Sequence, residues 1–239
     1  MRRVPTPSGP FPFQLYFEDL GEIDEICLEA LKAQSLLPSR PEPIRIERFV
    51  EKQFKTALIY EDLGPEHLGC IIFNASGGVE AILVSRSLEE QSTIPARRRV
   101  RSTVAHEAGR GLLHGALFVE RDRPDLLSGA VGKNKRQILC RSEDILVDTQ
   151  RSYGGRWWEF QANQAIGSLL LPRILVGAFL DQLGIEFASF RSAMLTPTQR
   201  ESLERKAAVA FDVNPIVVRI RLDWLFSQKK KITKCNWSA

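Results

Sequence analysis

This sequence is poor in cysteine and histidine and has no long apolar run. Its four cysteines are scattered along the chain, at Cys27, Cys70, Cys140 and Cys235. Because they form no C-x-x-C spacing, they exclude a disulfide scaffold and a zinc site of paired cysteines. A membrane-spanning helix needs roughly 18 consecutive apolar residues, and the most apolar stretch, 165–180, is interrupted by Pro172 and Arg173. We therefore expect reduced thiols and no membrane segment.

The charge balance is mildly basic. The 239 residues include 33 Lys and Arg against 29 Asp and Glu, a formal net charge of +4, which is too weak by itself to indicate nucleic-acid binding. In the N-terminal segment Met1–Pro5, a basic pair is followed by proline rather than by an apolar stretch, so no signal peptide is predicted. Together with the scattered cysteines, this predicts a cytoplasmic protein.

The N-terminal and central regions alternate between helix and strand patterns. Residues 1–13, rich in proline, are predicted to form an irregular arm. The predicted helices are Glu18–Leu37, Ile44–Phe54, Ser102–Leu117 and Trp157–Leu171. Three runs rich in Ile, Val and Leu are predicted strands, at Thr56–Tyr60, Gly69–Asn74 and Val79–Ser85, and a further strand is expected within 137–147. Short connections between the runs favour an antiparallel or mixed sheet, so the predicted fold class is α+β.

Two further helices are expected near the C-terminus. Thr196 is a plausible N-cap and Pro197 suits the first helical position. A turn at 213–215 leads into a helix at Ile216–Phe226, and such a pair resembles a helix-turn-helix. The second helix is heavily apolar and carries Asp223. This pattern favours packing against the rest of the chain over insertion into a DNA groove.

One segment contains candidate catalytic and metal-binding residues. Two of the three histidines lie in the predicted helix at 102–117, where His106 is followed directly by Glu107. This pair matches the start of the zincin signature H-E-x-x-H. In that signature, histidines one helical turn apart bind one zinc ion, and the glutamate takes a proton from the metal-bound water. A third ligand comes from elsewhere in the chain, and Glu159 on a second predicted helix is the candidate.

These residues resemble the ImmA/IrrE family of zinc metallo-endopeptidase-like proteins. The matching segments are Ala105–Gly109, Gly111–His114, Glu159–Asn163 with Leu169–Pro172, and Phe211–Leu222. The resemblance implies a zincin-like fold, a hydrolase that cleaves helix-turn-helix repressors, and control of phage, mobile-element or stress-response genes. It also implies that His106 and Glu159 bind zinc and that Glu107 is the general base.

The resemblance suggests three regions. Residues 1–40 are expected to form the N-terminal arm and helix. Residues 41–190 would form the zincin-like metallopeptidase domain, with its small mixed sheet and motif helices. Residues 191–239 would form the C-terminal helical region, which ends in a basic tail.

One position departs from the family pattern. Members with peptidase activity have a second histidine where this chain has Arg110, and a guanidinium cannot bind zinc because it offers only donors. His114 lies two helical turns from the first ligand, about 12 Å along the axis. Cys140 is a conceivable replacement, although a buried strand cysteine is the simpler interpretation. We therefore expect weak or absent zinc.

Without the metal, two carboxylates face each other. Like charges in a partly buried cleft repel, so one carboxylate would tend to stay protonated. We predict that Arg110 pairs with Glu159, and also with Glu107, in place of the metal. The alternative is that Arg110 bends toward solvent.

Three functions remain open at this point. The first is a metallo-endopeptidase homologue with an impaired metal site that acts on a helix-turn-helix repressor-type partner. The second is a pseudoenzyme, a catalytically inactive module that binds a repressor or an antitoxin-like protein. The third is a DNA-binding transcription regulator that uses the C-terminal helices, which their apolar character disfavours.

Overall fold

The structure is a computed structural model. It describes residues 2–5, 11, 13–17, 19, 21–119, 137–141, 145, 156–187 and 195–226. The strands are β1 (Arg2–Pro5), β2 (Phe13–Tyr16), β3 (Leu58–Glu61), β4 (His67–Phe73), β5 (Val79–Ser85) and β6 (Gln137–Arg141). The helices are α1 (Gly21–Ala33), α2 (Ile46–Phe54), α3 (Arg86–Glu89), α4 (Ile94–His114), the 3₁₀ turn η1 (Gly115–Phe118), α5 (Trp157–Leu170), α6 (Arg173–Gln182), α7 (Pro197–Ala210) and α8 (Pro215–Phe226). The predicted α+β class is confirmed.

The main sheet is mixed, as the short connections predicted. Its order is β3-β5-β4-β6. Strand β3 runs parallel to β5, whereas β4 is antiparallel to both β5 and β6. The predicted strands are found with shifted ends, except for β5, whose bounds match the prediction.

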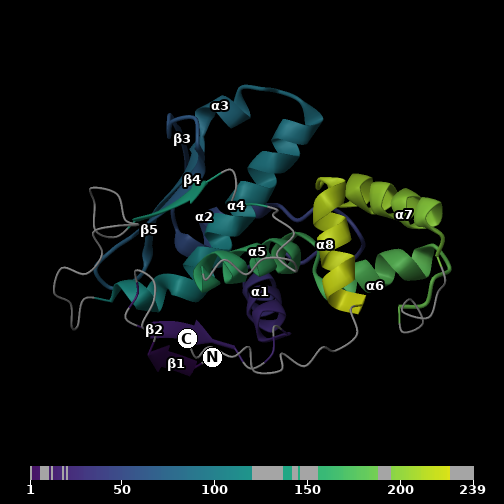
Figure 1. The fold of residues 1–239 in the computed structure, drawn as a ribbon, viewed down its shortest axis with the longest axis horizontal. Helices are drawn as coiled ribbons and strands as arrows, with labels where there is room; N and C mark the ends of the chain where they lie inside the picture. Colours follow the sequence, from purple (N-terminus) through teal and green to yellow (C-terminus); the bar gives the residue numbers. More distant parts are fainter. Residues whose placement is uncertain are drawn as a thin grey trace.

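Helix α4 lies at the centre of the molecule. Figure 1 shows the sheet on one side of it and α6 to α8 on the other, with α5 crossing close by. The helices α4 and α5 approach closely at Gly109, where an added Cβ would lie 2.4 Å from the Cβ of Ala165. Only glycine allows this close approach. The contact brings together the helix that carries His106 and Glu107 and the helix that carries Glu159.

Helix α4 begins eight residues before the predicted start at Ser102, so that prediction was wrong. The Thr93 hydroxyl accepts a hydrogen bond from the Ala96 N–H, and a proline occupies the first turn. These two features are typical of a helix start, and they lie before the arginines at 97–99 and 101. Two of these arginines pair with a carboxylate of the C-terminal region. Asp212 accepts hydrogen bonds of 3.0 Å from both Arg97 and Arg98.

The N-terminal segment differs from the predicted irregular arm. Strands β1 and β2 form an antiparallel hairpin in which Pro5 pairs with Phe13 at the strand end, a place that tolerates proline. Phe11 is buried against the rings of Phe118, Trp157 and Trp158. Phe11 therefore joins this segment to the core, whereas strand β1 stays exposed.

Helix α1 is shorter than the predicted Glu18–Leu37, and helices α3 and α6 were not predicted. Pro172 ends the α5 pattern as expected, but it also precedes α6 directly. Among the described residues, no single helix has both the length and the apolar character to cross a membrane. The helices α5 and α6 meet those criteria only as a pair, with a bend of 47°. The predicted loop at 118–136 and the basic tail lie almost entirely outside the described residues.

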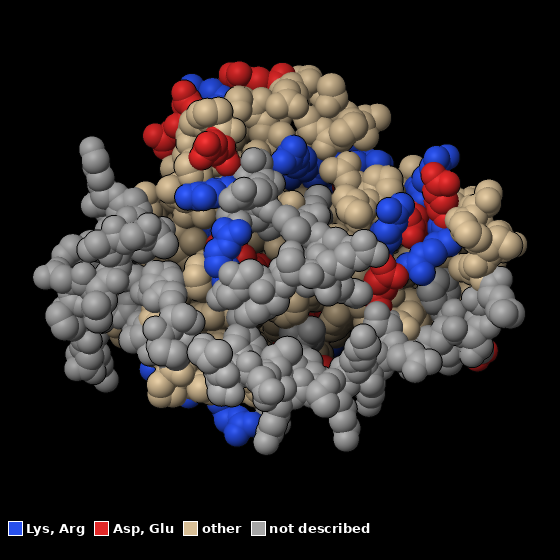
Figure 2. All heavy atoms as spheres, viewed as in Figure 1, with Lys and Arg blue, Asp and Glu red and all other residues tan. Residues whose placement is uncertain are grey.

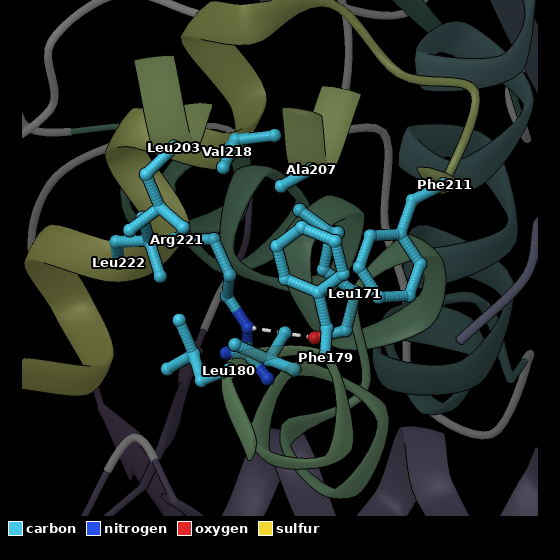
Figure 3. Close-up of a pocket in the computed structure, with 10 residues that line it drawn as sticks. Leu171, Phe179, Leu180, Leu203, Ala207, Phe211, Val218, Arg221 and Leu222 are labelled. Atoms are coloured by element: carbon cyan, nitrogen blue, oxygen red, sulfur yellow. Dashed lines mark hydrogen bonds between the residues drawn. The ribbon is translucent and has the colours of Figure 1, made fainter. Parts of the chain in front are cut away.

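The C-terminal helices pack against the rest of the chain, as predicted. Thr196 and Gln199 form a capping box at the start of α7. On α8, Arg221 is buried, pairs with Asp24 of α1 at 2.8 Å and donates to the carbonyl of Leu171 at 3.0 Å. Figure 3 shows this arginine among the apolar residues of α6, α7 and α8. The helix pair therefore shares the core of the chain.

Leu222→Ala tests this packing. Leu222 is 3% exposed, so its truncation should lower the free energy of unfolding by about 2–5 kcal/mol. Val209→Ala on α7, where the side chain is 71% exposed, is the control and should change it by less than about 0.5 kcal/mol. Urea denaturation measures both. A separate transition for the C-terminal helices would instead indicate an independent module.

Candidate functional site

The candidate site lies where α4 meets α5 beneath the sheet. His106, Glu107 and Arg110 share one face of α4, since residues three and four apart are neighbours on a helix. These three side chains are fully buried, and Glu159 of α5 is 7% exposed. The structure therefore brings together every residue predicted for the site.

Arg110 lies between the two carboxylates. Its Nη2 donates to both oxygens of Glu159, at 2.6 and 2.5 Å. Its Nη1 donates to the oxygens of Glu107 at 3.1 and 3.3 Å and to the carbonyl of Ile138 on β6 at 3.4 Å. The prediction that Arg110 pairs with both glutamates is confirmed, and the alternative of an arginine turned to solvent is wrong.

His106 is oriented by a residue to which the sequence analysis gave no role. Its Nδ1 lies 3.0 Å from Oδ1 of Asn163, an amide oxygen that accepts from a protonated Nδ1. The other ring nitrogen, Nε2, lies 3.2 Å from Oε2 of Glu159 without forming a hydrogen bond. The signal for Asn163 was its spacing: it follows Glu159 by one helical turn on the same face of α5.

The two carboxylates have opposite electrostatic environments. Burial favours the neutral form of Glu159, but the charge of Arg110 and the nearby His106 outweigh it and hold its pKa well below the ordinary value. For Glu107, burial prevails over Arg110 and raises the pKa. Burial also opposes the charge of Arg110, yet the two carboxylates outweigh it and raise the pKa of the guanidinium. The same guanidinium therefore acts on two carboxylates with different results: it lowers the pKa of Glu159, whereas burial keeps that of Glu107 raised.

The sheet contributes Cys140 to the same place. It is buried on β6, and its Sγ belongs to a group with ligand atoms of His106 and Glu107 that all lie within 4.8 Å of one another. Gly69, its partner in register on β4, makes room for Glu107: an added Cβ there would lie 2.8 Å from Oε1 of that glutamate.

His114 takes no part in this centre. Its Nε2 donates to Oε1 of Gln161 at 3.0 Å, and Gln161 in turn donates to the carbonyl of Leu15 at 2.6 Å. Burial lowers the pKa of His114 to about 4, although the bond to Gln161 opposes the shift. This histidine is a neutral core residue that connects α4, α5 and the N-terminal hairpin.

The residues do not fit a zinc ion bound as the family resemblance implies. Both oxygens of Glu159 are engaged by Arg110, and the guanidinium adds a positive charge and no ligand atom. The group of His106, Glu107 and Cys140 is a different set of ligands.

Comparison with known proteins adds no relative. No protein-family model matches this chain, and no curated protein matches it.

Arg110→Ala should unfold the protein more easily. Removal of the guanidinium leaves two buried carboxylates without a partner, and breaking a buried ion pair costs about 3–5 kcal/mol. Arg205→Ala is the control, because Arg205 is 71% exposed in its pair with Glu201 and such pairs contribute less than about 1 kcal/mol. Both are read from urea denaturation. Equal small losses would mean that the ion triad does not hold α4 to α5.

His114 should make stability depend on pH. Its pKa is about 4 in the folded chain and about 6.5 when unfolded. Below pH 6.5 the unfolded chain therefore takes up a proton that the folded chain does not. The free energy of unfolding should fall by about 1 kcal/mol from this residue between pH 7 and 5.5.

The His114→Gln variant should lose this part of the slope, which isolates it from the carboxylates common to both proteins. His67→Gln on β4 is the matched control and should keep the wild-type slope. Denaturation curves at the two pH values measure the difference. An unchanged slope in His114→Gln would show that the folded chain accepts a proton at His114.

Proposed function

We propose that this chain is a homologue of the ImmA/IrrE zinc metallo-endopeptidases that acts on a helix-turn-helix repressor-type partner by binding it rather than by cutting it. The observation that carries the proposal is the guanidinium of Arg110, which lies between the carboxylates of Glu107 and Glu159. In this proposal, a cation built into the chain stands at the position of the second zinc ligand, and the fold is zincin-like.

The arrangement of elements supports the zincin-like fold. The helix that carries the His-Glu pair lies against β4 and β5 of the mixed sheet, and a second helix brings a glutamate to the same point. His106 presents Nε2 to Glu159, while Asn163 bonds the other ring nitrogen. Such an outer partner is the usual companion of a histidine ligand.

The state of Glu107 argues against hydrolysis. A general base must be within hydrogen-bond reach of the proton that it removes. Here Glu107 is fully buried, and both of its oxygens accept from Arg110. A chain with this centre keeps the framework of the cleft and loses the means to activate water, which favours recognition of a repressor or antitoxin-like protein without cleavage.

The C-terminal helices support a protein partner over DNA. Phosphate binding needs basic side chains that are available to the ligand. On α7 and α8, Glu204 pairs with Arg200 at 3.1 Å and with Arg219 at 3.0 Å, and Asp223 also pairs with Arg200. Figure 2 shows acidic and basic side chains intermixed over these helices. Direct DNA binding is therefore disfavoured.

Zinc content tests the state of the centre. The test uses Cys140→Ser as the background, which removes the buried thiol near His106 and Glu107. Purified without chelators, this protein should contain well under one zinc per chain. Adding Arg110→His completes the H-E-x-x-H spacing and frees Glu159, so zinc affinity should rise by several orders of magnitude. Adding Arg110→Gln instead, which removes the charge without adding a ligand, is the control and should not gain zinc. One tightly held zinc in Cys140→Ser with Arg110 intact would overturn the proposal.

Partner binding is tested with the helix-turn-helix regulator encoded nearest to this chain in its genome. Calorimetry should show a complex with the wild-type chain, and gel analysis should show the regulator intact after incubation with zinc. The Trp158→Ala variant tests whether the buried aromatic wall beside Glu159 supports the complex. Cleavage by the wild-type chain would show an active peptidase, and the absence of any complex would remove the proposed partner class.

A further inference from the structure

We infer that His106, Glu107 and Cys140 form a second kind of metal site, one that takes a thiol-seeking divalent cation through the cysteine. This site goes beyond the proposed function and rests on it in one respect, namely that Arg110 keeps Glu159 out of the ligand set. The three residues offer a nitrogen, an oxygen and a sulfur, a mixed set suited to borderline and soft ions.

The geometry brings these donors close to binding distance. Their ligand atoms lie within 4.8 Å of one another, and all three residues are buried. A tetrahedral ion with bonds of about 2.0–2.3 Å holds its donors about 3.3–3.8 Å apart. The donors must therefore approach one another by roughly 1 Å. Of the two carboxylates, Glu107 is the one held less closely by Arg110, at 3.1 and 3.3 Å against 2.5 and 2.6 Å for Glu159.

The ring of His106 is held in the orientation of a metal ligand. His106 is fully buried, and its Nδ1 is held by Asn163, which fixes the ring as the outer partner of a metal-binding histidine does. Its Nε2 lies 3.2 Å from Oε2 of Glu159, so this nitrogen faces the charged centre and is the ring atom that would bind the ion.

The charges also favour a cation. Glu107 and Glu159 carry two carboxyl groups against the one guanidinium of Arg110. A metal ion deprotonates a coordinating thiol. If the imidazole is counted as neutral, the two carboxylates, the guanidinium, the thiolate of Cys140 and a divalent ion together have zero net charge. The same cation without a thiolate would leave the centre positive.

The sheet register selects Cys140 over the neighbouring thiol. Cys140 pairs with Gly69 of β4, and a side chain at Gly69 would point toward Glu107 of α4. Cys70 is the next residue along β4. Successive side chains of a strand point to opposite faces, so Cys70 points away from α4. Burial, with Glu107 adding to it, raises the pKa of the Cys70 thiol to about 12. Cys70 is therefore a matched control within the same sheet.

Cobalt titration of the full chain tests the site. Thiolate bound to Co²⁺ gives a near-ultraviolet charge-transfer band, which we expect in the wild-type chain and in Cys70→Ser. Cys140→Ser should lose the band, and its Co²⁺ affinity should fall by more than the roughly 10–100-fold typical for loss of an outer partner. No band in the wild-type chain, or a band that survives in Cys140→Ser, would overturn the inference.

A double variant separates this inference from the proposed function. In Arg110→His combined with Cys140→Ser, Co²⁺ should bind without the thiolate band, because the repaired helix and Glu159 then supply the ligands. If this variant binds no metal while the wild-type band is present, the proposed family arrangement fails and the cysteine site stands. Should Cys140→Ser not fold, Cd²⁺ should slow alkylation of Cys140 in the wild-type chain in dilute urea and leave Cys70 unaffected. Equal rates for Cys140 with and without Cd²⁺ would overturn the site.

Discussion

The ion triad of Glu107, Arg110 and Glu159 is the interaction on which the centre of this molecule depends. Its three side chains are buried where α4, α5 and β6 meet. Buried charges are tolerated only when they are paired and hydrogen-bonded. Arg110 meets that requirement for both carboxylates at once, because its planar fork presents donors in two directions. A single side chain thus joins two helices and the edge of the sheet.

Close backbone contacts make this arrangement possible. Gly109 lets α4 and α5 approach until an added Cβ would collide with Ala165, and Gly69 gives Glu107 its place against β4. A larger side chain at either position would move the carboxylates away from Arg110. The charged centre and the small residues beside it therefore form one structural feature.

The proposed loss of metal has a cost and a benefit. A bound cation would join His106 and the carboxylates only when the ion is available, and binding of a metal contributes directly to folding. A guanidinium is always present and always charged, so the helices stay together under any metal supply. In the proposed function, such a chain would lose the activation of water, and with it a role for Glu107 as a base.

Local patterns in the sequence determined a large part of this protein. The ends of α5 and the N-cap of α7 at Thr196 depend on residues within one or two turns, and both are found almost where they were predicted. The inability of Arg110 to bind a metal is likewise a property of its side chain alone. From the match of His106 and Glu159 to a family pattern, the pairing with Arg110 could also be predicted.

Only the tertiary structure decided the remaining features. Arg97 of α4 binds a partner, Asp212, that is more than a hundred residues away, and the N-terminal hairpin is held by aromatic rings from later helices. Cys140 reaches the centre because the sheet order places β6 beside β4. Periodicity and capping signals extend over a few residues, whereas strand order and burial arise from contacts between distant segments, and no local pattern contains them.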